Sequence, residues 1–205
     1  MDQLFIFPFN GNGLEALSSV KDKFKFLGFI DDNEEKIGSN KMGFKVFNRE
    51  ILKKYPEAKI LAVPGSPSSY KFRDQIISGI NKDIIKFPKV INQNAYISPL
   101  AKIGYNVLIM TGVVITANAT IGNHVCILPN TVIHHDSSIG DYSLIGSNVT
   151  IAGNSSIGKK CYIGSCSSVI NNIVVEDSCL IGMGTNVIKS VSEKSIIVGN
   201  PGNLI

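Results

Sequence analysis

Branched hydrophobic residues recur at every sixth position over nearly half of the chain. From Ala95 to Ser190 the sequence divides without a gap into sixteen hexads, and the third position of each is Ile or Val, from Ile97 to Val187. The first position is always Ala, Val, Thr, Ser, Cys or Ile. Positions 1 and 3 lie two residues apart, so on a strand both side chains point to the same face. The pattern therefore predicts sixteen short strands, each burying one face.

Small and turn-forming residues occupy other hexad positions. Position 4 is Gly in seven hexads, and position 6 is Asn in six. Both residue types tolerate the backbone angles of tight turns, so we expect both positions to turn the chain. Three hexads then form a triangular coil of 18 residues. Stacked coils lie about 4.8 Å apart. The predicted fold is a parallel β-solenoid, whose hand the pattern does not give.

The first part of the chain follows a different pattern, in which short apolar runs alternate with helical spacing. The runs Leu4–Phe7, Phe24–Asp32 and Ala58–Gly65 are predicted strands, and LEALSSVKDK and SSYKFRDQIISGI are predicted helices. This alternation predicts a small parallel α/β domain. We therefore expect two domains, residues 1–90 and residues 91–205.

Three loops of the first domain are candidate ligand sites, because ligands of parallel sheets bind beyond the carboxyl ends of the strands. They are Asn10–Gly13, Asp31–Asp32 and Gly65–Ser66. The loop NGNG is short of a full GxGxxG motif and is equally consistent with a simple tight turn. The acidic pair suits hydrogen bonds to ribose or sugar hydroxyls, with a solvated loop as the alternative. Arg73 is a candidate phosphate contact, although a surface helix position explains it better.

Composition excludes several classes of protein. The 205 residues are 44 % hydrophobic, which is enough for one large or two small domains. The net charge is +4, and the lysines are scattered, which argues against a nucleic-acid groove. No signal-peptide pattern follows Met1, and no apolar run approaches the about 20 residues of a membrane span. The cysteines have no paired spacing and resemble small core residues, which suits a reducing cytoplasm: Cys126, Cys161, Cys166 and Cys179.

The hexads resemble those of the hexapeptide-repeat acyltransferases, and the N-terminal domain narrows this resemblance. A small Rossmann-like domain joined directly to such repeats is similar to the family of sialic acid O-acetyltransferases and UDP-4-amino-sugar (bacillosamine pathway) N-acetyltransferases. The resemblance implies a left-handed parallel β-helix and a homotrimer with active sites between neighbouring prisms. It also implies acetyl-CoA along the β-helix, a nucleotide-sugar in the N-terminal domain, and no metal.

The resemblance extends to single residues of the N-terminal loops. The family's first loop ends in glycine-histidine-glycine, which Gly11, Asn12 and Gly13 match except that Asn12 replaces the histidine. The family's acidic pair matches Asp31 and Asp32. By resemblance, the substrate-binding residues are Asn10, Gly11, Asn12, Gly13, Asp31 and Asp32.

Two of the three histidines stand side by side in the stretch TVIHHDSSIG. His134 and His135 hold positions 4 and 5 of their hexad, at a corner of the predicted prism. One coil further along, His135 stacks against Gly153, and the same column continues to Asn171 and Lys189. A glycine there leaves room for a thioester and exposes a backbone N–H to a developing oxyanion.

Acetyl transfer needs a base that removes a proton from the attacking amine or hydroxyl, and histidine suits that role. The family's histidine–acid motif matches His135 and Asp136, and its glycine donor matches Gly153. These three residues are the predicted catalytic and oxyanion-binding groups. Both substrates can be held together, so no covalent acyl-enzyme is needed and the cysteines are not nucleophiles. We expect His134 to be structural or peripheral and His124 to lie on the surface.

The predicted CoA site continues along the same corner to the C-terminus. The family's glycine-x-proline after the last coil matches Gly199–Pro201. The family commonly continues with alanine and a basic residue, whereas Gly202 and Asn203 stand here, so Lys189 or Lys160 would replace the basic contact. The predicted CoA-binding set is Ser165, Asn171, Gly184, Lys189, Gly199 and Pro201.

Several functions compete at this point. An N-acetyltransferase acting on a UDP-4-amino sugar in surface-glycan synthesis is the first, and an O-acetyltransferase acting on sialic acid or a related sugar is the second. A nucleotide site in the N-terminal pocket would favour the first. A non-catalytic trimeric scaffold leaves the His135–Gly153 column unexplained. A zinc hydratase of the γ-carbonic-anhydrase type needs three converging histidines, and the spacing of the three histidines here does not match that type.

Overall fold

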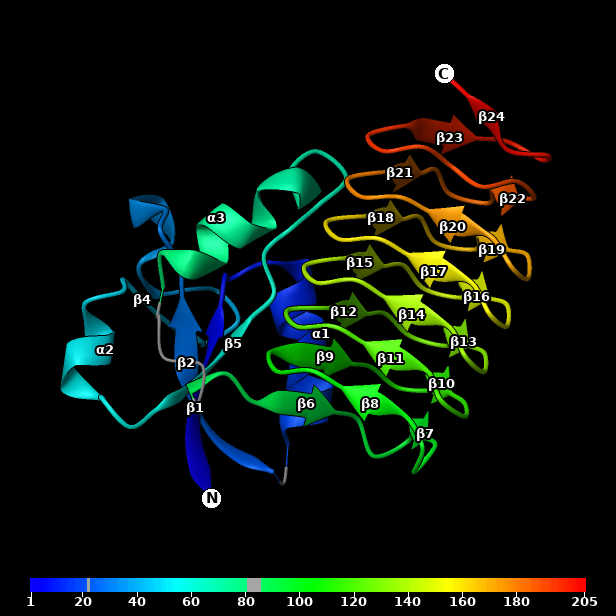
Figure 1. Cartoon of the computed structure of the whole chain (residues 1–205). Coiled ribbons are helices and arrows are strands. Elements are labelled where there is room, and N and C mark those ends of the chain that lie inside the picture. Colours follow the sequence, from blue (N-terminus) through cyan, green and yellow to red (C-terminus); the bar gives the residue numbers. More distant parts are fainter. Residues whose placement is uncertain (22, 81–85) are drawn as a thin grey trace.

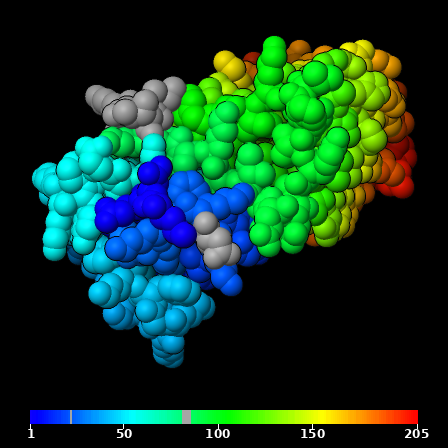
Figure 2. All heavy atoms as spheres, turned by 90° about the horizontal axis from the view of Figure 1, so that it is seen from below, coloured from blue at the N-terminus to red at the C-terminus, as the bar shows by residue number. Residues whose placement is uncertain are grey.

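A three-sided β-helix and a small α/β unit lie side by side in the computed structural model, which describes residues 1–21, 23–80 and 86–205 (Figure 1). The view along the stack places the α/β unit, in blue and cyan, beside the first coils of the β-helix, in green (Figure 2). The chain passes from the α/β unit into the β-helix through β6 (Lys89–Ile91), which pairs with the first full coil.

The β-helix has one strand on positions 2 and 3 of almost every predicted hexad, which confirms the repeat. Pairing joins residues 18 apart, as in Val114 with Val132, so three hexads make one coil. Face 1 contains β7 (Tyr96–Ile97), β10 (Val114–Ile115), β13 (Val132–Ile133), β16 (Thr150–Ile151), β19 (Ser168–Val169) and β22 (Asn186–Val187). Face 2 contains β8 (Lys102–Ile103), β11 (Thr120–Ile121), β14 (Ser138–Ile139), β17 (Ser156–Ile157) and β20 (Val174–Val175). Face 3 contains β6, β9 (Val107–Ile109), β12 (Cys126–Ile127), β15 (Leu144–Ile145), β18 (Tyr162–Ile163), β21 (Leu180–Ile181), β23 (Ile196–Val198) and β24 (Asn203–Leu204).

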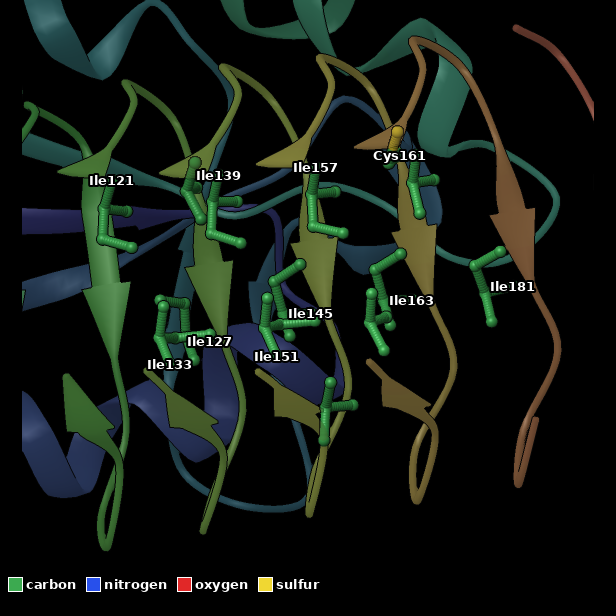
Figure 3. Close-up of a cluster of buried hydrophobic side chains, with 14 of the residues drawn as sticks. Ile121, Ile127, Ile133, Ile139, Ile145, Ile151, Ile157, Cys161, Ile163 and Ile181 are labelled. Atoms are coloured by element: carbon green, nitrogen blue, oxygen red, sulfur yellow. The ribbon is translucent and has the colours of Figure 1, made fainter. Parts of the chain in front are cut away.

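The core of the β-helix is a set of isoleucine columns that run along the stack (Figure 3). Ile121, Ile139 and Ile157 come from face 2, one from each successive coil, and all are buried. Position 1 is buried beside them, as Val113 and Cys161 show. Each coil therefore buries its branched side chains against the next, which is the main hydrophobic contribution to this half of the molecule.

The chain turns at position 6, and the expectation for position 4 was wrong. Within the sixteen hexads, the residues with positive φ all hold position 6, including Asn118 at 60° and Asp136 at 60°. The glycines at position 4 do not have positive φ, and packing between coils explains why glycine is found there. A Cβ on Gly140 would lie 2.5 Å from the carbonyl carbon of Gly158 in the next coil. Glycine at position 4 therefore lets the coils approach each other closely.

The α/β unit is built on a five-stranded sheet in the order β3-β4-β2-β1-β5. Its strands are β1 (Asp2–Phe7), β2 (Phe24–Ile30), β3 (Gly38–Ser39), β4 (Lys45–Phe47) and β5 (Lys59–Ala62), all parallel except for the β3–β4 pair. The three predicted strands are confirmed as β1, β2 and β5. Their carboxyl ends lie at one edge of the sheet, as expected from their parallel pairing.

Helices cover both faces of this sheet. α1 (Gly11–Val20) lies between the sheet and face 3 of the β-helix, where Ala16 and Val20 join one hydrophobic cluster with Leu108 and Leu144. It begins at Gly11, three residues before the predicted LEALSSVKDK helix. The other helices are short: η1 (Glu34–Lys36), α2 (Ile51–Lys54), η2 (Tyr70–Phe72) and α3 (Arg73–Ser78). None of the helices in the described ranges is long and apolar enough to cross a bilayer.

Three side chains differ from their predicted environments. Arg73 and His124 were expected on the surface, but both are buried where the two units meet. Both lie there because α3 packs against the turns of the β-helix, a contact between distant segments that no local pattern encodes. Cys166 was expected in the core but is exposed, because it holds position 6, whose side chains lie at a turn. The other three cysteines are buried, as predicted.

Candidate active site

His135 and Asp136 form a hydrogen-bonded pair at the corner that joins face 1 to face 2. The His135 Nδ1 lies 2.8 Å from Asp136 Oδ2, and both side chains are about half exposed. Asn118, one coil below, donates from Nδ2 to Asp136 Oδ1 at 3.0 Å. These hydrogen bonds, first from the imidazole and then from Asn118, hold the pKa of Asp136 below its ordinary value. Asp136 is therefore an ionised acceptor that fixes the orientation of the imidazole.

Gly153 lies directly against the imidazole, as the register predicts. A Cβ at this position would lie 2.7 Å from both Cε1 and Nε2 of His135. The imidazole ring therefore occupies the space that a side chain at position 153 would fill. Nε2 is the ring nitrogen on the glycine side, since Nδ1 is held by Asp136.

The backbone N–H of Gly153 is left available at this corner. At other corners the equivalent position-5 N–H is taken by a side chain one coil further along, as when Lys159 N donates to Asp177 Oδ1 at 2.7 Å. Here the side chain one coil further along is Asn171, which donates from Nδ2 to the Gly153 carbonyl at 3.3 Å. Among the described residues no acceptor takes the Gly153 N–H.

The structure brings some predicted CoA residues to this corner and its upper end. Lys189 is exposed two coils above Gly153. It lines a cavity of about 250 Å³ together with Pro201. Gly199 lies beside it, because its carbonyl accepts from Asn186 N at 3.1 Å. A continuous surface therefore runs from His135 to the C-terminal segment.

Ser165 and Gly184 lie elsewhere. Both are at the corner that joins face 3 to face 1, where the Gly184 N–H donates to the Ser165 carbonyl at 2.9 Å. They hold hexad positions 5 and 6, as His135 and Asp136 do, but on a different edge of the prism. Within one chain these two residues and His135 do not form one site.

The first N-terminal loop is partly structural. Asn10 caps α1, and its Oδ1 accepts from Gly13 N at 2.9 Å. A Cβ on Gly13 would lie 2.5 Å from the Pro8 carbonyl oxygen, so this glycine permits a close helix–strand approach. Gly11 is exposed with open space around it. Asn12 donates from Nδ2 to the Gly65 carbonyl at 3.4 Å, so the first and third predicted loops meet.

The acidic pair divides into one structural and one accessible carboxylate. Asp31 is buried, accepts from Phe9 N at 3.0 Å and forms an ion pair with Lys36 at 2.9 Å. Asp32 is half exposed and forms a bidentate pair with Arg49, with both N···O distances at 2.6 Å. Asp31, Asp32 and Arg49 line a cavity of about 490 Å³ at the carboxyl edge of the sheet. Arg49 also lies over the Phe7 ring, 5.2 Å from its centroid.

Sequence reasoning missed Arg49 and Asn118. Arg49 follows β4 at the same sheet edge as Asp32, but β4 is too short to be recognised from its pattern. Asn118 could have been found, because it precedes Asp136 by one coil in the register that placed His135 against Gly153.

Comparisons with known proteins agree with the fold. A family model, bacterial transferase hexapeptide (six repeats), matches residues 118–153. A variant of perosamine N-acetyltransferase from Caulobacter crescentus, solved with CoA and GDP-perosamine, superposes with a TM-score of 0.88 over 100 % of this chain and 97 % of that one, at 18 % identity. The chain has the fold of the hexapeptide-repeat sugar N-acetyltransferases.

Two further solved structures share this fold. The acetyltransferase domain of PglB from Neisseria gonorrhoeae, with acetyl coenzyme A, has a TM-score of 0.86 and 20 % identity over 99 % of this chain and 98 % of that one. WeeI from Acinetobacter baumannii has a TM-score of 0.75 and 22 % identity, with each chain covered in full. No curated protein sequence matches significantly.

Proposed function

We propose that this chain transfers the acetyl group of acetyl-CoA to the amino group of a nucleotide-linked 4-amino sugar, with His135 as general base. The observation that carries the proposal is the His135–Asp136 pair packed against Gly153 on a fold shared over its whole length with sugar N-acetyltransferases. Residues 91–205 form the acyltransferase domain, a left-handed β-helix. Residues 1–90 form a Rossmann-like domain that holds the nucleotide-sugar.

The chemistry follows from the protonation pattern of the site. An ionised Asp136 can only accept, so Nδ1 of the neutral imidazole carries the proton and Nε2 has a free lone pair. The sugar amine attacks the thioester carbonyl carbon while Nε2 accepts its proton. The Gly153 N–H stabilises the oxyanion of the tetrahedral intermediate. Collapse of this intermediate breaks the C–S bond, releases CoA thiolate and leaves an amide on the sugar.

In this proposal, the amino sugar that accepts the acetyl group is bound by a different subunit from the one that supplies His135. In the described parts of the chain, the α/β unit contacts face 3 and the corner that joins face 2 to face 3. In those parts it makes no contact with the corner that carries His135. A homotrimer with its axis parallel to the stack would place the nucleotide-sugar pocket of one chain against His135 of the next. Ser165 and Gly184, on their separate corner, would then contact CoA bound mainly by a neighbouring chain.

Three solved structures of similar proteins support a nucleotide-linked amino sugar as the substrate class, but they differ in the nucleotide. Two are histidine variants of the perosamine enzyme that were solved with CoA and GDP-perosamine. AntD from Bacillus cereus, which covers 58 % of this chain at a TM-score of 0.54, was solved with a dTDP-4-amino sugar and CoA. We retain a UDP-4-amino sugar as the first candidate and GDP-linked and dTDP-linked sugars as direct competitors.

Release of free thiol from acetyl-CoA, measured against a panel of UDP-, GDP- and dTDP-4-amino sugars and free sialic acid, tests the proposal. Turnover with one of the nucleotide-4-amino sugars is expected. Turnover with sialic acid alone would show that the chain is an O-acetyltransferase instead. No turnover with any compound of the panel would contradict both functions.

A further inference from the structure

Besides its hydrophobic contact with face 3, the α/β unit contacts the β-helix along one column of turn residues. These residues hold position 6 at the corner between face 2 and face 3 in five consecutive coils, and we call them the docking column: Asn106, His124, Tyr142, Lys160 and Ser178. Each is one coil, or 18 residues, from the next. In Figure 1, α3 lies beside these turns of the β-helix. Contacts with these residues therefore determine the position of the α/β unit along the stacking axis of the β-helix.

Contacts at the two ends of the column are hydrogen bonds to backbone atoms. The Asn106 amide accepts from Ala62 N at 2.8 Å and donates to Ala62 O at 2.9 Å. Ala62 ends the edge strand β5, so Asn106 satisfies backbone groups that an edge leaves unpaired. At the other end the Tyr70 hydroxyl donates to the Ser178 carbonyl at 3.1 Å.

Arg73 holds the centre of the column. Its Nη2 donates to the His124 carbonyl at 2.6 Å, and its Nε donates to the Tyr142 carbonyl at 2.8 Å. Its Nη1 donates to the Pro64 carbonyl, in the loop that follows β5. The side chain is fully buried, and burial lowers the pKa of the guanidinium to about 10, so it remains charged near neutral pH. One cation thus joins two coils of the β-helix to one loop of the α/β unit.

That loop is the third candidate ligand loop of the α/β unit, and it contacts the first one. Gly65 follows Pro64 with a φ of +130°, and a Cβ there would lie 3.0 Å from Arg73 Nη1. The Gly65 carbonyl accepts from Asn12, which belongs to the first substrate loop. The guanidinium therefore supports the backbone that joins the first and third candidate ligand loops.

We propose that Arg73 is a positioning residue that fixes the height of the nucleotide-sugar pocket along the β-helix at the coil that carries His135. Tyr142, which accepts from Arg73, lies on the same coil as His135. Rotation about an axis parallel to the stack leaves every height unchanged, so a pocket aligned with Tyr142 of its own chain is aligned with His135 of the next. This inference rests on the proposed function and adds the residue that sets its geometry.

The sharpest variant is Arg73→Lys, which keeps the charge but replaces a planar fork of donors by one ammonium. It cannot hold three carbonyls in the same geometry. Tyr70→Phe removes only the hydroxyl contact to Ser178 and is a second, milder variant should Arg73→Lys fold poorly. Lys86→Met is the matched control, because it breaks the Lys86–Glu57 ion pair within the α/β unit and leaves the hydrogen bonds of Arg73 and Tyr70 to the docking column in place.

Hydrogen–deuterium exchange and steady-state kinetics are measured on the full-length oligomer. In Arg73→Lys we expect exchange over residues 61–69 to rise about tenfold, since one or more hydrogen bonds to a charged donor are lost. We expect kcat/KM for the amino sugar to fall at least as much, while the Kd of acetyl-CoA and exchange in residues 131–136 and 149–154, around His135 and Gly153, stay unchanged. Tyr70→Phe should shift both in the same direction by less, and Lys86→Met should match wild type.

Unchanged exchange over residues 61–69 in both column variants would overturn the positioning role. A uniform rise across the whole chain with a parallel loss of acetyl-CoA binding would also overturn it, because Arg73 would then only stabilise the fold. Exchange needs no substrate. If wild type acetylates no sugar in the panel, the proposed function fails, and the exchange result still decides whether Arg73 fixes the loop.

Discussion

At the scale of residues, the candidate site depends on what surrounds one imidazole. Asp136, itself held by Asn118, fixes the ring through Nδ1, and Gly153 leaves space for the ring on the opposite side. His134, the adjacent residue, has its backbone N–H bonded to Ile151 O in the next coil and holds position 4, where neighbouring coils pack closely. Two consecutive histidines therefore have different environments, and only His135 has a carboxylate partner and a glycine beside it.

We expect His135→Gln to lower kcat by about 10²–10⁴-fold, the usual contribution of a general base. Glutamine keeps a hydrogen-bonding side chain of similar reach but cannot accept a proton near neutral pH. The Kd of acetyl-CoA, measured by calorimetry, should stay within error of wild type. His134→Gln is the matched control, and equal losses in the two variants would contradict the assignment of His135.

His124 gives a prediction for pH dependence. Burial, and then the nearby Arg73 charge, lower its pKa to about 4, against an opposing effect of Asp141. Between about pH 6.5 and pH 4 the unfolded chain therefore binds a proton that the folded chain does not, and stability falls as the pH falls. The contribution is on the order of 1–3 kcal/mol.

Thermal unfolding of wild type and His124→Phe from pH 4 to pH 7 measures this contribution. Phenylalanine keeps a ring to stack on Tyr142, whose ring centroid lies 4.6 Å from that of His124. The variant should lose most of the rise in Tm between about pH 4 and pH 6.5. An identical pH profile in the two proteins would show that His124 does not titrate in this way.

At the scale of elements, the hexad sequence determines both the strands and the spacing between coils. Asn and other residues with positive φ at position 6 turn the chain, whereas glycine at position 4 permits the close stacking. The two roles look alike in sequence, because glycine and asparagine are both common in tight turns. A backbone angle and a steric approach are distinguished by the structure.

Gly140→Ala tests the stacking role. Its Cβ would meet the Gly158 backbone at 2.5 Å, and backbone cannot move aside as a flexible side chain can. We expect a loss of about 1–3 kcal/mol in the free energy of unfolding, measured by urea denaturation. Gly11→Ala, where the added Cβ meets nothing within 4 Å, should change it by no more than about 0.5 kcal/mol. Equal stabilities in the two variants would contradict the stacking role.

The sequence anticipated the repeating elements better than the contacts between units. The period of six placed His135 against Gly153, because register in a solenoid is arithmetic along the chain. It could not place Arg73 or His124, since their burial depends on how α3 docks against turns that lie 51 and 69 residues away in sequence. Asp31 stays a predicted ligand-binding carboxylate, and the sequence could not show that it also accepts from Phe9 N and pairs with Lys36 of η1.

At the scale of the whole molecule, the proposed reaction needs two chains. The nucleotide-sugar pocket and the His135 corner lie on different edges of one subunit, while Arg73 sets their relative heights. A site that combines His135 of one subunit with the pocket of another explains why a pocket and a base that do not meet in one chain can serve one reaction. This intersubunit site is the central claim of our account.

Complementation between two inactive variants tests that claim most directly. His135→Gln removes the base, and Asp32→Lys blocks the pocket by reversing the charge beside Arg49. Each variant alone should transfer acetyl from acetyl-CoA to the nucleotide-4-amino sugar at no more than about 1 % of the wild-type rate. Co-expressed in equal amounts, they should recover about one quarter of the wild-type rate, because one interface in four joins an intact base to an intact pocket. Mixed oligomers that stay inactive while wild type turns over would contradict an active site shared between subunits.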